Sequence, residues 1–441
     1  MNETFAMISL GCAKNLVNSE QMLYLLDGAG YCLVPEAEGA DFAVVNTCGF
    51  IDAAKSEAIE TILSLAQLKA EGKLGGVIVT GCLSERYQDS ILEELPEIDA
   101  VLGVGSFSEI VEAADRVCAG ERYASFRDKN APVEELPRIV STGPGWAYLR
   151  IAEGCNNFCA FCAIPYIRGR YRSRPIEHIL EEARDLAAHG VKELIVIAQD
   201  ITRYGTDLYG KRSLARLCRE LSEIEGIEWI RLHYLYPDQF DEELIDEIAR
   251  NDKIVKYLDI PIQHINDGIL KKMNRRGTGG EIRALFRTLR GRIPGLVLRT
   301  SLIAGLPGEG EAEFEELCAF LREAKIERAG VFPFSPEEGT PAAQMEHVDE
   351  AEARRRADLI LQLQQPIMDA FLQGFVGKTL RVLHEYDDEE TGLHAGRSYA
   401  DSPEIDGLVF FSGEGALGEL VPVTVDEVDD GFLYGHREAE A

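Results

Sequence analysis

The sequence is short of basic residues and has no long hydrophobic run. Its 441 residues include 45 lysines and arginines against 76 aspartates and glutamates, a formal net charge of −31. So negative a chain does not attract nucleic acid over its whole surface, whereas a basic partner would be attracted. No apolar run approaches the ~20 residues of a membrane helix. The first ten residues also lack the basic and apolar regions of a secretory signal. We therefore expect a cytoplasmic protein.

The chain also lacks the second ligand pair of an ordinary structural zinc site. Cys155, Cys159 and Cys162 form a C-x3-C-x2-C run, and no C-x2-C or H-x3-H pair follows it. Thiolates suit iron–sulfur clusters, zinc or copper(I). Three thiolates on a four-iron cube leave one iron open to chelate a small molecule. The spacing resembles that of the radical S-adenosylmethionine (SAM) enzymes, whose open iron holds the amino and carboxylate groups of SAM; zinc or incidental core thiols are the alternative.

Three further cysteines follow three strand-like runs near the start of the chain. The runs are Phe5–Leu10, Phe42–Asn46 and Val77–Thr80, and helical patterns follow them over 16–30, 53–69 and 85–94. This alternation predicts a doubly wound parallel sheet. Cys12, Cys48 and Cys82 close the runs at near-equal separations. Because the carboxyl ends of parallel strands meet at one edge, we expect a second cluster site there. Ordinary buried thiols are the alternative. We expect the other four cysteines to be core or surface thiols: Cys32, Cys118, Cys218 and Cys318.

The central segment predicts an incomplete (β/α)6 barrel. Residues 125–144 contain several prolines and glycines without a sustained period, which is typical of a linker. Six strand-like runs then alternate with helical patterns, over 147–152, 193–198, 229–235, 257–262, 296–303 and 329–334. In such barrels the chemistry lies at the carboxyl ends of the strands. The C-x3-C-x2-C run follows the first of these six strands, as that rule requires.

Polar residues end several of these predicted strands. Gln199 and Gln263 are either cofactor-binding side chains or loop amides without a ligand. His264 could act as an acid or base, although a lone histidine is more often structural. The glycine-rich turn 305–310 lacks the Lys-Ser/Thr of a P-loop and favours a tight turn that approaches a cofactor.

Four arginines, Arg168, Arg170, Arg172 and Arg174, form the one basic concentration that includes an aromatic residue. They could grip RNA phosphate or an acidic protein loop. They could equally brace acidic neighbours near the cluster. The sequence leaves both interpretations open.

The C-terminal segment changes character after a long polar helix. That helix is expected over 349–364, with a break near Pro366 and a short continuation to Leu372. Four short strand-like runs follow, over 378–384, 408–411, 419–425 and 432–435, and they predict a small antiparallel barrel. From residue 376 onward 16 acidic residues face 4 basic ones. A single-strand nucleic-acid barrel would carry a positive groove, so a basic protein partner fits better.

Together the three segments resemble the methylthiotransferase family of radical SAM enzymes over essentially the whole length. Two branches of that family modify either a tRNA adenosine or an aspartate of ribosomal protein S12. The chain is similar to the S12 branch in the stretches 198–205 (AQDITRYG), 234–237 (YLYP) and 256–264 (KYLDIPIQH). One departure is Gly310, where the family usually has Thr or Ser at the start of the next helix.

The resemblance implies methylthio transfer to the β-carbon of an aspartate in S12, with a tRNA adenosine as the alternative substrate. It implies two [4Fe–4S] clusters and SAM as cofactors, and an electron donor such as flavodoxin. Cys155, Cys159 and Cys162 would hold the cluster that reduces SAM, and Cys12, Cys48 and Cys82 the auxiliary cluster that presents sulfur. Phe161, Gln199 and Gln263 would line the SAM pocket. The implied domains are an N-terminal methylthiotransferase domain (1–124), a linker (125–144), a radical SAM domain (145–372) and a TRAM domain (373–441).

Overall fold

The computed structural model describes residues 3–437 of the chain. Its contacts divide the chain into two compact units. Unit 1 comprises the residues up to 141 together with 152–173 and 335–343, and unit 2 comprises 142–151, 174–334 and the residues from 344 onward. Among the described residues, no helix combines the length and the apolar character needed to cross a membrane. The domain boundaries expected from the sequence stay predictions.

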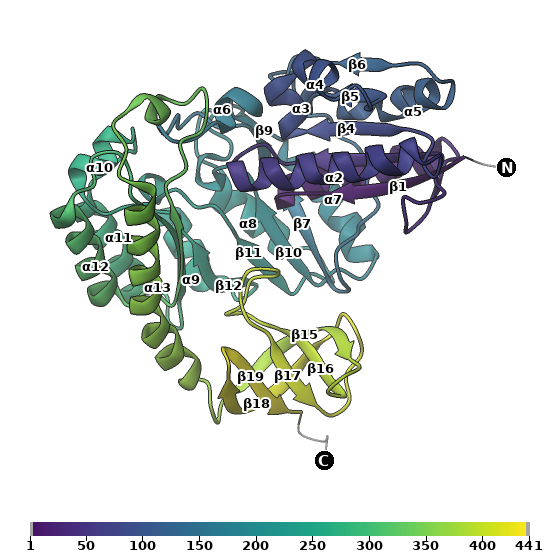
Figure 1. Ribbon diagram of the computed structural model, residues 1–441. Coiled ribbons are helices and arrows are strands. Elements are labelled where there is room, and N and C mark those ends of the chain that lie inside the picture. Colours follow the sequence, from purple (N-terminus) through teal and green to yellow (C-terminus); the bar gives the residue numbers. More distant parts are fainter. Residues whose placement is uncertain (1–2, 438–441) are drawn as a thin grey trace. The chain divides into compact units, whose positions relative to one another are not determined.

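Unit 1 is built on a parallel sheet of six strands in the order β2-β1-β3-β4-β5-β6 (Figure 1). The strands are β1 (Thr4–Ser9), β2 (Cys32–Leu33), β3 (Phe42–Thr47), β4 (Val77–Gly81), β5 (Ala100–Leu102) and β6 (Tyr123–Ser125). Every neighbouring pair is parallel. Because side chains alternate along a strand, Val44 and Val45 enter different apolar clusters on the two faces.

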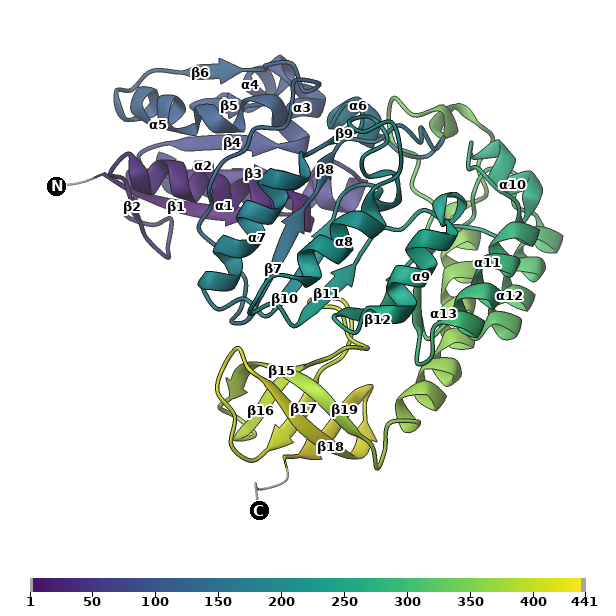
Figure 2. The same ribbon diagram turned by 180° about the vertical axis from the view of Figure 1, so that it is seen from behind.

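Helices cover both faces of this sheet. On the face of Val44 lie α1 (Ala13–Gly28) and α5 (Ile110–Cys118), the latter preceded by the 3-10 helix η1 (Val104–Glu109). On the face of Val45 lie α2 (Asp52–Ala70), α3 (Cys82–Tyr87) and α4 (Asp89–Glu94). Figure 1 shows α2 in front of the sheet, and Figure 2 shows the same sheet from behind. The prediction of a doubly wound sheet is confirmed.

The single helix predicted over 85–94 was wrong. Helix α3 already begins at Cys82, and α3 and α4 are separated at Gln88, whose φ is 45°. A residue with that φ cannot continue a right-handed helix. The strands β2, β5 and β6 were not predicted, because two or three residues are too few to show a period.

Unit 1 also contains the loop that carries the C-x3-C-x2-C run. The short strands β8 (Ala152–Glu153) and β9 (Arg172–Ser173) pair antiparallel and close this loop, which includes α6 (Ile164–Ile167). The segment 335–343 packs in the same unit, where Ala342 N donates to the carbonyl oxygen of Ala160 at 2.8 Å. The loop is therefore held within unit 1 by backbone contacts.

Unit 2 begins with six parallel strands in the order β14-β13-β12-β11-β10-β7. They are β7 (Trp146–Arg150), β10 (Glu193–Ile197), β11 (Trp229–Leu232), β12 (Ile254–Asp259), β13 (Val297–Ala304) and β14 (Arg328–Pro333). The helices between and after them are α7 (Ile176–Ala188), α8 (Leu214–Ser222), α9 (Glu242–Arg250), α10 (Asp267–Lys272), α11 (Gly279–Arg292), α12 (Glu311–Ala324) and α13 (Glu350–Gln373), with 3-10 turns η2 (Ile201–Arg203) and η3 (Pro237–Gln239). The 3-10 turn η4 (Pro341–Gln344) begins in the segment 335–343 of unit 1. No pairing among the described residues joins β7 to β14, so the predicted partial barrel is confirmed.

Two details of unit 2 differ from the sequence expectation. Strand β12 begins three residues earlier than predicted, at Ile254. The predicted break at Pro366 was wrong, because α13 runs through this proline without interruption. Buried residues on both sides of it, Ile360 and Leu372, anchor the helix, and this packing outweighs the local cost of proline.

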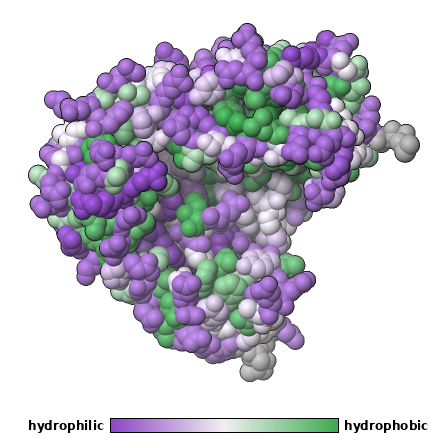
Figure 3. Space-filling view, in the orientation of Figure 1, coloured by the Kyte–Doolittle hydropathy of each residue, from purple (hydrophilic) through white to green (hydrophobic). Residues whose placement is uncertain are grey.

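The C-terminal part of unit 2 is a closed five-stranded barrel in the order β15-β16-β17-β19-β18. Its strands are β15 (Thr379–Asp388), β16 (Leu393–Ser398), β17 (Val409–Ser412), β18 (Leu420–Asp429) and β19 (Phe432–His436). The predicted small barrel is confirmed, although β17 and β19 pair in parallel and β16 was not predicted. In Figure 3, hydrophilic side chains cover most of the visible face of the protein, in keeping with 27% charged residues.

A buried group of charges joins the two parts of unit 2. Glu193, at the start of β10, accepts hydrogen bonds from Arg231 and from Arg397 of the C-terminal barrel, both at 2.7 Å. All three side chains are at most 1% exposed. Burial by itself would raise the pKa of Glu193, but the two guanidinium groups outweigh it and lower that pKa. The ionised carboxylate therefore holds the barrel to the strand.

Candidate metal centre and cofactor site

Cys12, Cys48 and Cys82 follow three adjacent strands of unit 1. Cys12 lies between β1 and α1, Cys48 follows β3, and Cys82 opens α3 directly after β4. These parallel strands lie side by side in the order β1-β3-β4, so their carboxyl ends share one edge. The strand order reverses between β1 and β3, and such a switch point is where doubly wound sheets bind ligands. The structure thus places the three predicted ligands at one edge.

Two glycines allow the strand ends to approach closely. Gly11 has a φ of 92°, and a Cβ at this position would lie 2.7 Å from the Cβ of Cys48. Gly81 has a φ of 99°, and a Cβ there would lie 2.5 Å from the carbonyl oxygen of Thr47. Any other residue would combine an unfavourable φ with a steric clash. The glycines next to Cys12 and Cys82 are therefore required by the shape of the site.

The side chain of Asn15 ties the three strand ends together. Its Nδ2 donates to the carbonyl oxygens of Leu10 at 3.0 Å and Thr47 at 2.8 Å. Its Oδ1 lies 3.7 Å from the sulfur of Cys82. Asn15 is only 1% exposed. One buried amide thus contacts the ends of β1 and β3 and the first residue after β4.

The three thiols influence one another's ionisation. Burial, and then the charge of Cys82, raises the pKa of Cys48 to about 11. Burial also raises the pKa of Cys82, with Arg168 opposing and Cys12 adding to the rise. For Cys12, burial acts in the same direction, but Lys14 and Arg168 outweigh it and the pKa is lowered. Three neighbouring thiolates are stable only beside added positive charge, which bound iron supplies. The trio therefore fits an iron–sulfur cluster.

Arg168 is the buried cation that faces this trio. Its Nε donates to the sulfur of Cys82 at 3.4 Å, and one terminal nitrogen donates to Glu153 at 2.8 Å. The other terminal nitrogen donates to the side-chain oxygen of Asn15. The side chain is 1% exposed. The sequence singled out Arg168 only as a member of a basic run, and no local signal separated it from its neighbours.

The C-x3-C-x2-C loop is shaped by local backbone contacts. The amide of Cys155 donates to the carbonyl oxygen of Gly169 at 3.1 Å, and the amide of Cys162 donates to that of Cys159 at 3.0 Å. The sulfur of Cys155 accepts from the amide of Asn157 at 3.5 Å. Phe158 has a φ of 51°, an unusual value for a phenylalanine. Such strain is concentrated at functional sites.

Both cysteine trios belong to unit 1. Cys82 packs in one buried apolar group with Ala163 and Ile167, which follow Cys162 closely in the chain. All ten cysteines are free thiols, so none of the six is lost to a disulfide. Ligands held by the two trios would therefore lie within the same compact unit.

The remaining predicted cofactor residues lie at the expected places in their own units. Phe161 is half-buried in the cysteine loop of unit 1. In unit 2, Gln199 follows β10 and Gln263 follows β12, and both are half-buried. Gln263 has a φ of 69° and bridges to Leu302 of β13. Their contact with SAM stays a prediction.

His264 lies in a buried group of polar side chains. Its side chain is fully buried, its Nδ1 accepts from the amide of Asn266 at 3.0 Å, and its Nε2 lies 3.2 Å from Glu309. Glu309 also accepts from Arg356 at 2.8 Å and from the amide of Gly305 at 2.9 Å. Burial would raise the pKa of Glu309, but the contacts with His264 and Arg356 lower it. This group braces the glycine-rich turn after β13.

The arginine run divides into buried and exposed members. Arg168 is buried against Glu153, and Arg174 is buried and donates to Glu182 at 2.6 Å. Arg170 is exposed, and Arg172 donates to the carbonyl oxygen of Arg170 at 2.6 Å. The two buried members brace acidic neighbours, so they are not available to grip a phosphate.

Three family models match the chain, in the order of its segments. They are the "Uncharacterized protein family UPF0004" over residues 4–103, the "Radical SAM superfamily" over 149–321 and the "TRAM domain" over 376–437. A solved structure of the radical SAM methyltransferase TsrM from Kitasatospora setae, with cobalamin and a [4Fe–4S] cluster bound, shares the fold. Its TM-score is 0.56 at 15% identity, covering 78% of this chain and 77% of that one. The fold and the cysteine motif thus define a radical SAM protein.

Curated relatives show to which family of radical SAM proteins the chain belongs. The ribosomal protein uS12 methylthiotransferase RimO of Acetivibrio thermocellus is 48% identical, covering 99% of this chain and 98% of the relative. The RimO of Lachnoclostridium phytofermentans is also 48% identical, covering 98% and 99%. The chain therefore belongs to the RimO family of radical SAM methylthiotransferases. Two [4Fe–4S] clusters and SAM are the cofactors of such an enzyme.

Proposed function

We propose that this chain transfers a methylthio group to the β-carbon of an aspartate in ribosomal protein uS12. One observation carries the proposal: two separate cysteine trios lie in a single compact unit, where Cys82 packs against the loop that follows Cys162. The relatives at 48% identity, which are named uS12 methylthiotransferases, support the choice of substrate.

The six cysteines would divide between the two clusters. Cys155, Cys159 and Cys162 would hold the cluster that binds SAM, and Cys12, Cys48 and Cys82 the auxiliary cluster. When bound, these cofactors supply hydrogen abstraction at an unactivated carbon and the sulfur and methyl group that are transferred. The family resemblance supports a contact with SAM for each of Phe161, Gln199 and Gln263.

The protein's own residues would position and shield these groups. Asn15 holds the strand ends that carry the auxiliary ligands at a fixed spacing, through its bonds to Leu10 and Thr47. Arg168 places a fixed positive charge beside Cys82. Because both side chains are buried, little water reaches them, and the charge acts in a medium of low dielectric.

The partners are part of the proposal. From residue 376 onward the chain has 16 acidic and 4 basic residues, a charge that suits a basic ribosomal protein. An electron donor such as flavodoxin would reduce the SAM cluster, and the reaction would take place in the cytoplasm, on free uS12 or on the ribosome. A tRNA substrate is the alternative, but the burial of Arg168 and Arg174 removes two of its expected phosphate contacts.

The test is an anaerobic reaction of the reconstituted enzyme with SAM, a reductant and either uS12 or intact ribosomes. We expect a methylthio mass gain on one aspartate of uS12 and none in a Cys155→Ala variant. Parallel reactions with tRNA serve as the second arm. A gain on tRNA without a gain on uS12 would overturn the substrate assignment, and SAM cleavage without either product would overturn methylthio transfer.

A further inference from the structure

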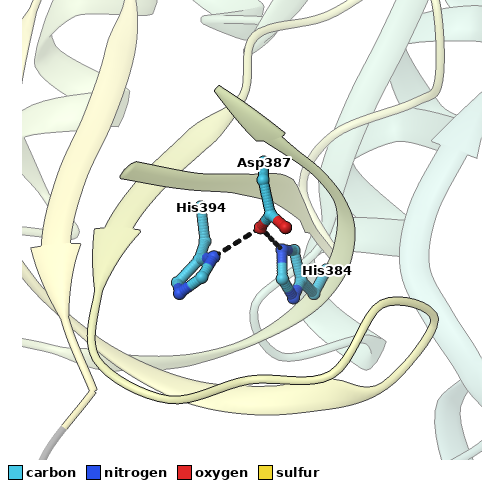
Figure 4. A group of neighbouring side chains, drawn as sticks. All are labelled: His384, Asp387 and His394. Carbon is cyan, nitrogen blue, oxygen red and sulfur yellow. Dashed lines mark hydrogen bonds and ion pairs between the residues drawn. The ribbon is translucent and has the colours of Figure 1, made fainter. Parts of the chain in front are cut away.

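Three metal-binding side chains converge on the C-terminal barrel, in a place that contains none of the six cysteines. His384 and Asp387 come from β15 and His394 from the neighbouring β16, and their side chains point toward one another (Figure 4). Oδ1 of Asp387 lies 2.9 Å from Nε2 of His384 and 2.6 Å from Nδ1 of His394. The three ligand atoms lie within 4.8 Å of one another.

His394 cannot satisfy both of its contacts as a neutral side chain. Its Nδ1 faces the carboxylate of Asp387, and its Nε2 lies 2.7 Å from the carbonyl oxygen of Gly413. Both oxygens only accept, whereas a neutral imidazole has one N–H to donate. Either tautomer therefore leaves a lone pair of His394 against a lone pair of oxygen. A metal ion bound at Nδ1, with Nε2–H donating to Gly413, would remove this conflict.

The surroundings of His394 and His384 suit a metal ion. When Nε2–H of His394 donates to Gly413, Nδ1 is free to ligate, and a backbone carbonyl is a usual outer partner of a metal-bound histidine. His384 directs a second imidazole nitrogen to the same carboxylate oxygen, and its side chain is only 1% exposed. Two imidazole nitrogens and one carboxylate oxygen thus lie within 4.8 Å of one another, as the ligands of one metal ion can.

The rings are held in place by packing. The ring centroids of His384 and His394 are 4.6 Å apart, and Phe411 of β17 lies 5.4 Å from the first and 5.2 Å from the second. In contrast, the side chain of Asp387 is 59% exposed. The donor set thus has a rigid inner side and an outer side open to a water ligand.

We propose that His384, Asp387 and His394 bind a divalent transition metal, with Zn²⁺ as the ion that best suits two imidazoles and a carboxylate. Zinc bonds of about 2.0–2.1 Å in a tetrahedron separate ligand atoms by about 3.3 Å. The two contacts of Asp387 would open from 2.9 and 2.6 Å to about that distance, by roughly 0.4 and 0.7 Å. The ion would cross-link β15 and β16 across the turn between them. This site is independent of the proposed methylthio transfer.

The experiment uses the full-length protein with both iron–sulfur clusters reconstituted, so that the cysteine thiols are occupied. Zinc chloride is titrated by calorimetry, and the zinc-loaded protein is examined by X-ray absorption at the zinc edge. The test variants are His394→Ala and Asp387→Ala, and Asp387→His is the variant that keeps a ligand. The matched control is His436→Ala, which removes a histidine of the same barrel that lies outside the proposed site and pairs with Asp426 at 2.8 Å.

We expect one zinc ion per chain, nitrogen and oxygen ligands without sulfur, and a loss of at least 100-fold in affinity for both alanine variants. Asp387→His and His436→Ala should bind zinc as the parent protein does. Circular dichroism verifies that each variant is folded. If an alanine variant does not fold, a His384→Gln variant provides a second test. Equal zinc affinity in all variants, no binding by the parent protein, or sulfur ligation would overturn the proposal.

Discussion

Arg168 donates a hydrogen bond to the sulfur of Cys82 at 3.4 Å, although 86 residues separate them in the chain. The same guanidinium group pairs with Glu153 at 2.8 Å, and its side chain is 1% exposed. The contact links the loop of one cysteine trio to a ligand of the other. Arg168 therefore sets both the stability of this contact and the charge next to Cys82.

Arg168→Met should destabilise unit 1 by about 3–5 kcal/mol, because the carboxylate of Glu153 would stay buried without its partner. It should also lower the reduction potential of the auxiliary cluster, because a positive charge that favours the added electron is removed. Denaturant unfolding measures the first effect and a redox titration followed by electron paramagnetic resonance the second. Arg170→Met, a change at an exposed arginine, should alter neither. An unchanged reduction potential in Arg168→Met would show that the charge of the guanidinium group does not influence the cluster.

Cys12→Ala and Cys155→Ala should each lose one cluster. If each trio holds one cube, either variant should retain about four of eight irons after anaerobic reconstitution. Iron and sulfide analysis with Mössbauer spectroscopy measures the remaining cluster. Cys32→Ala is the control, because Cys32 is an exposed free thiol, and it should keep the full iron content. Full iron in Cys12→Ala would contradict the assignment of the N-terminal trio.

Gly11→Ala should destabilise unit 1 and impair the auxiliary cluster. A positive φ costs an alanine roughly 1–2 kcal/mol, and the new Cβ would lie 2.7 Å from that of Cys48. Gly30→Ala is a matched control, since Gly30 has a φ of 94° but no atom within 4 Å of the added Cβ. We expect thermal unfolding to show a loss in both variants, larger for Gly11→Ala, and iron analysis to show a loss only for Gly11→Ala. Equal effects of the two changes would show that the close contact between the added Cβ and Cys48 does not contribute to the loss.

Glu193→Gln should destabilise unit 2 by about 3 kcal/mol, because Arg231 and Arg397 would lose their shared buried carboxylate. The folded-state pKa of Glu193 lies below its ordinary value of 4.5. Its ionised form therefore stabilises the fold above that pH, and this contribution is lost as the pH falls through the folded-state pKa.

The measurement for Glu193 is the unfolding temperature as a function of pH. The parent protein should lose more stability than Glu193→Gln on acidification below about pH 4.5. Glu225→Gln, at an exposed site, should follow the parent curve. Parallel curves for the parent protein and Glu193→Gln would mean that this carboxylate is not the group that titrates.

Much of the site was predictable because its signals are local. The C-x3-C-x2-C spacing places three thiols in one loop whatever the rest of the chain does. Cys12, Cys48 and Cys82 each follow a strand-like run, and parallel pairing alone then brings them to one edge. The sequence also has a helical pattern over 311–324, and α12 has these same bounds, because its apolar period and its flanking turn are both contained in the segment.

Other features depend on contacts that no local pattern contains. The continuity of α13 through Pro366 is one of them, because buried residues on both sides of the proline, Ile360 and Leu372, hold the helix. Strand β16 was not predicted because Gly396 and the polar residues around it have weak strand propensity. It forms because β15 and β17 pair with it on both sides.

The amino-acid sequence by itself determined the class of chemistry, since thiol spacing and strand–helix alternation are short-range properties of the chain. Only the folded structure decided that Arg168 meets Cys82 and that His384, Asp387 and His394 converge. Both arrangements join separate elements through side chains whose direction depends on strand register and burial. Those are set by the free energy of the whole fold rather than by neighbours in sequence.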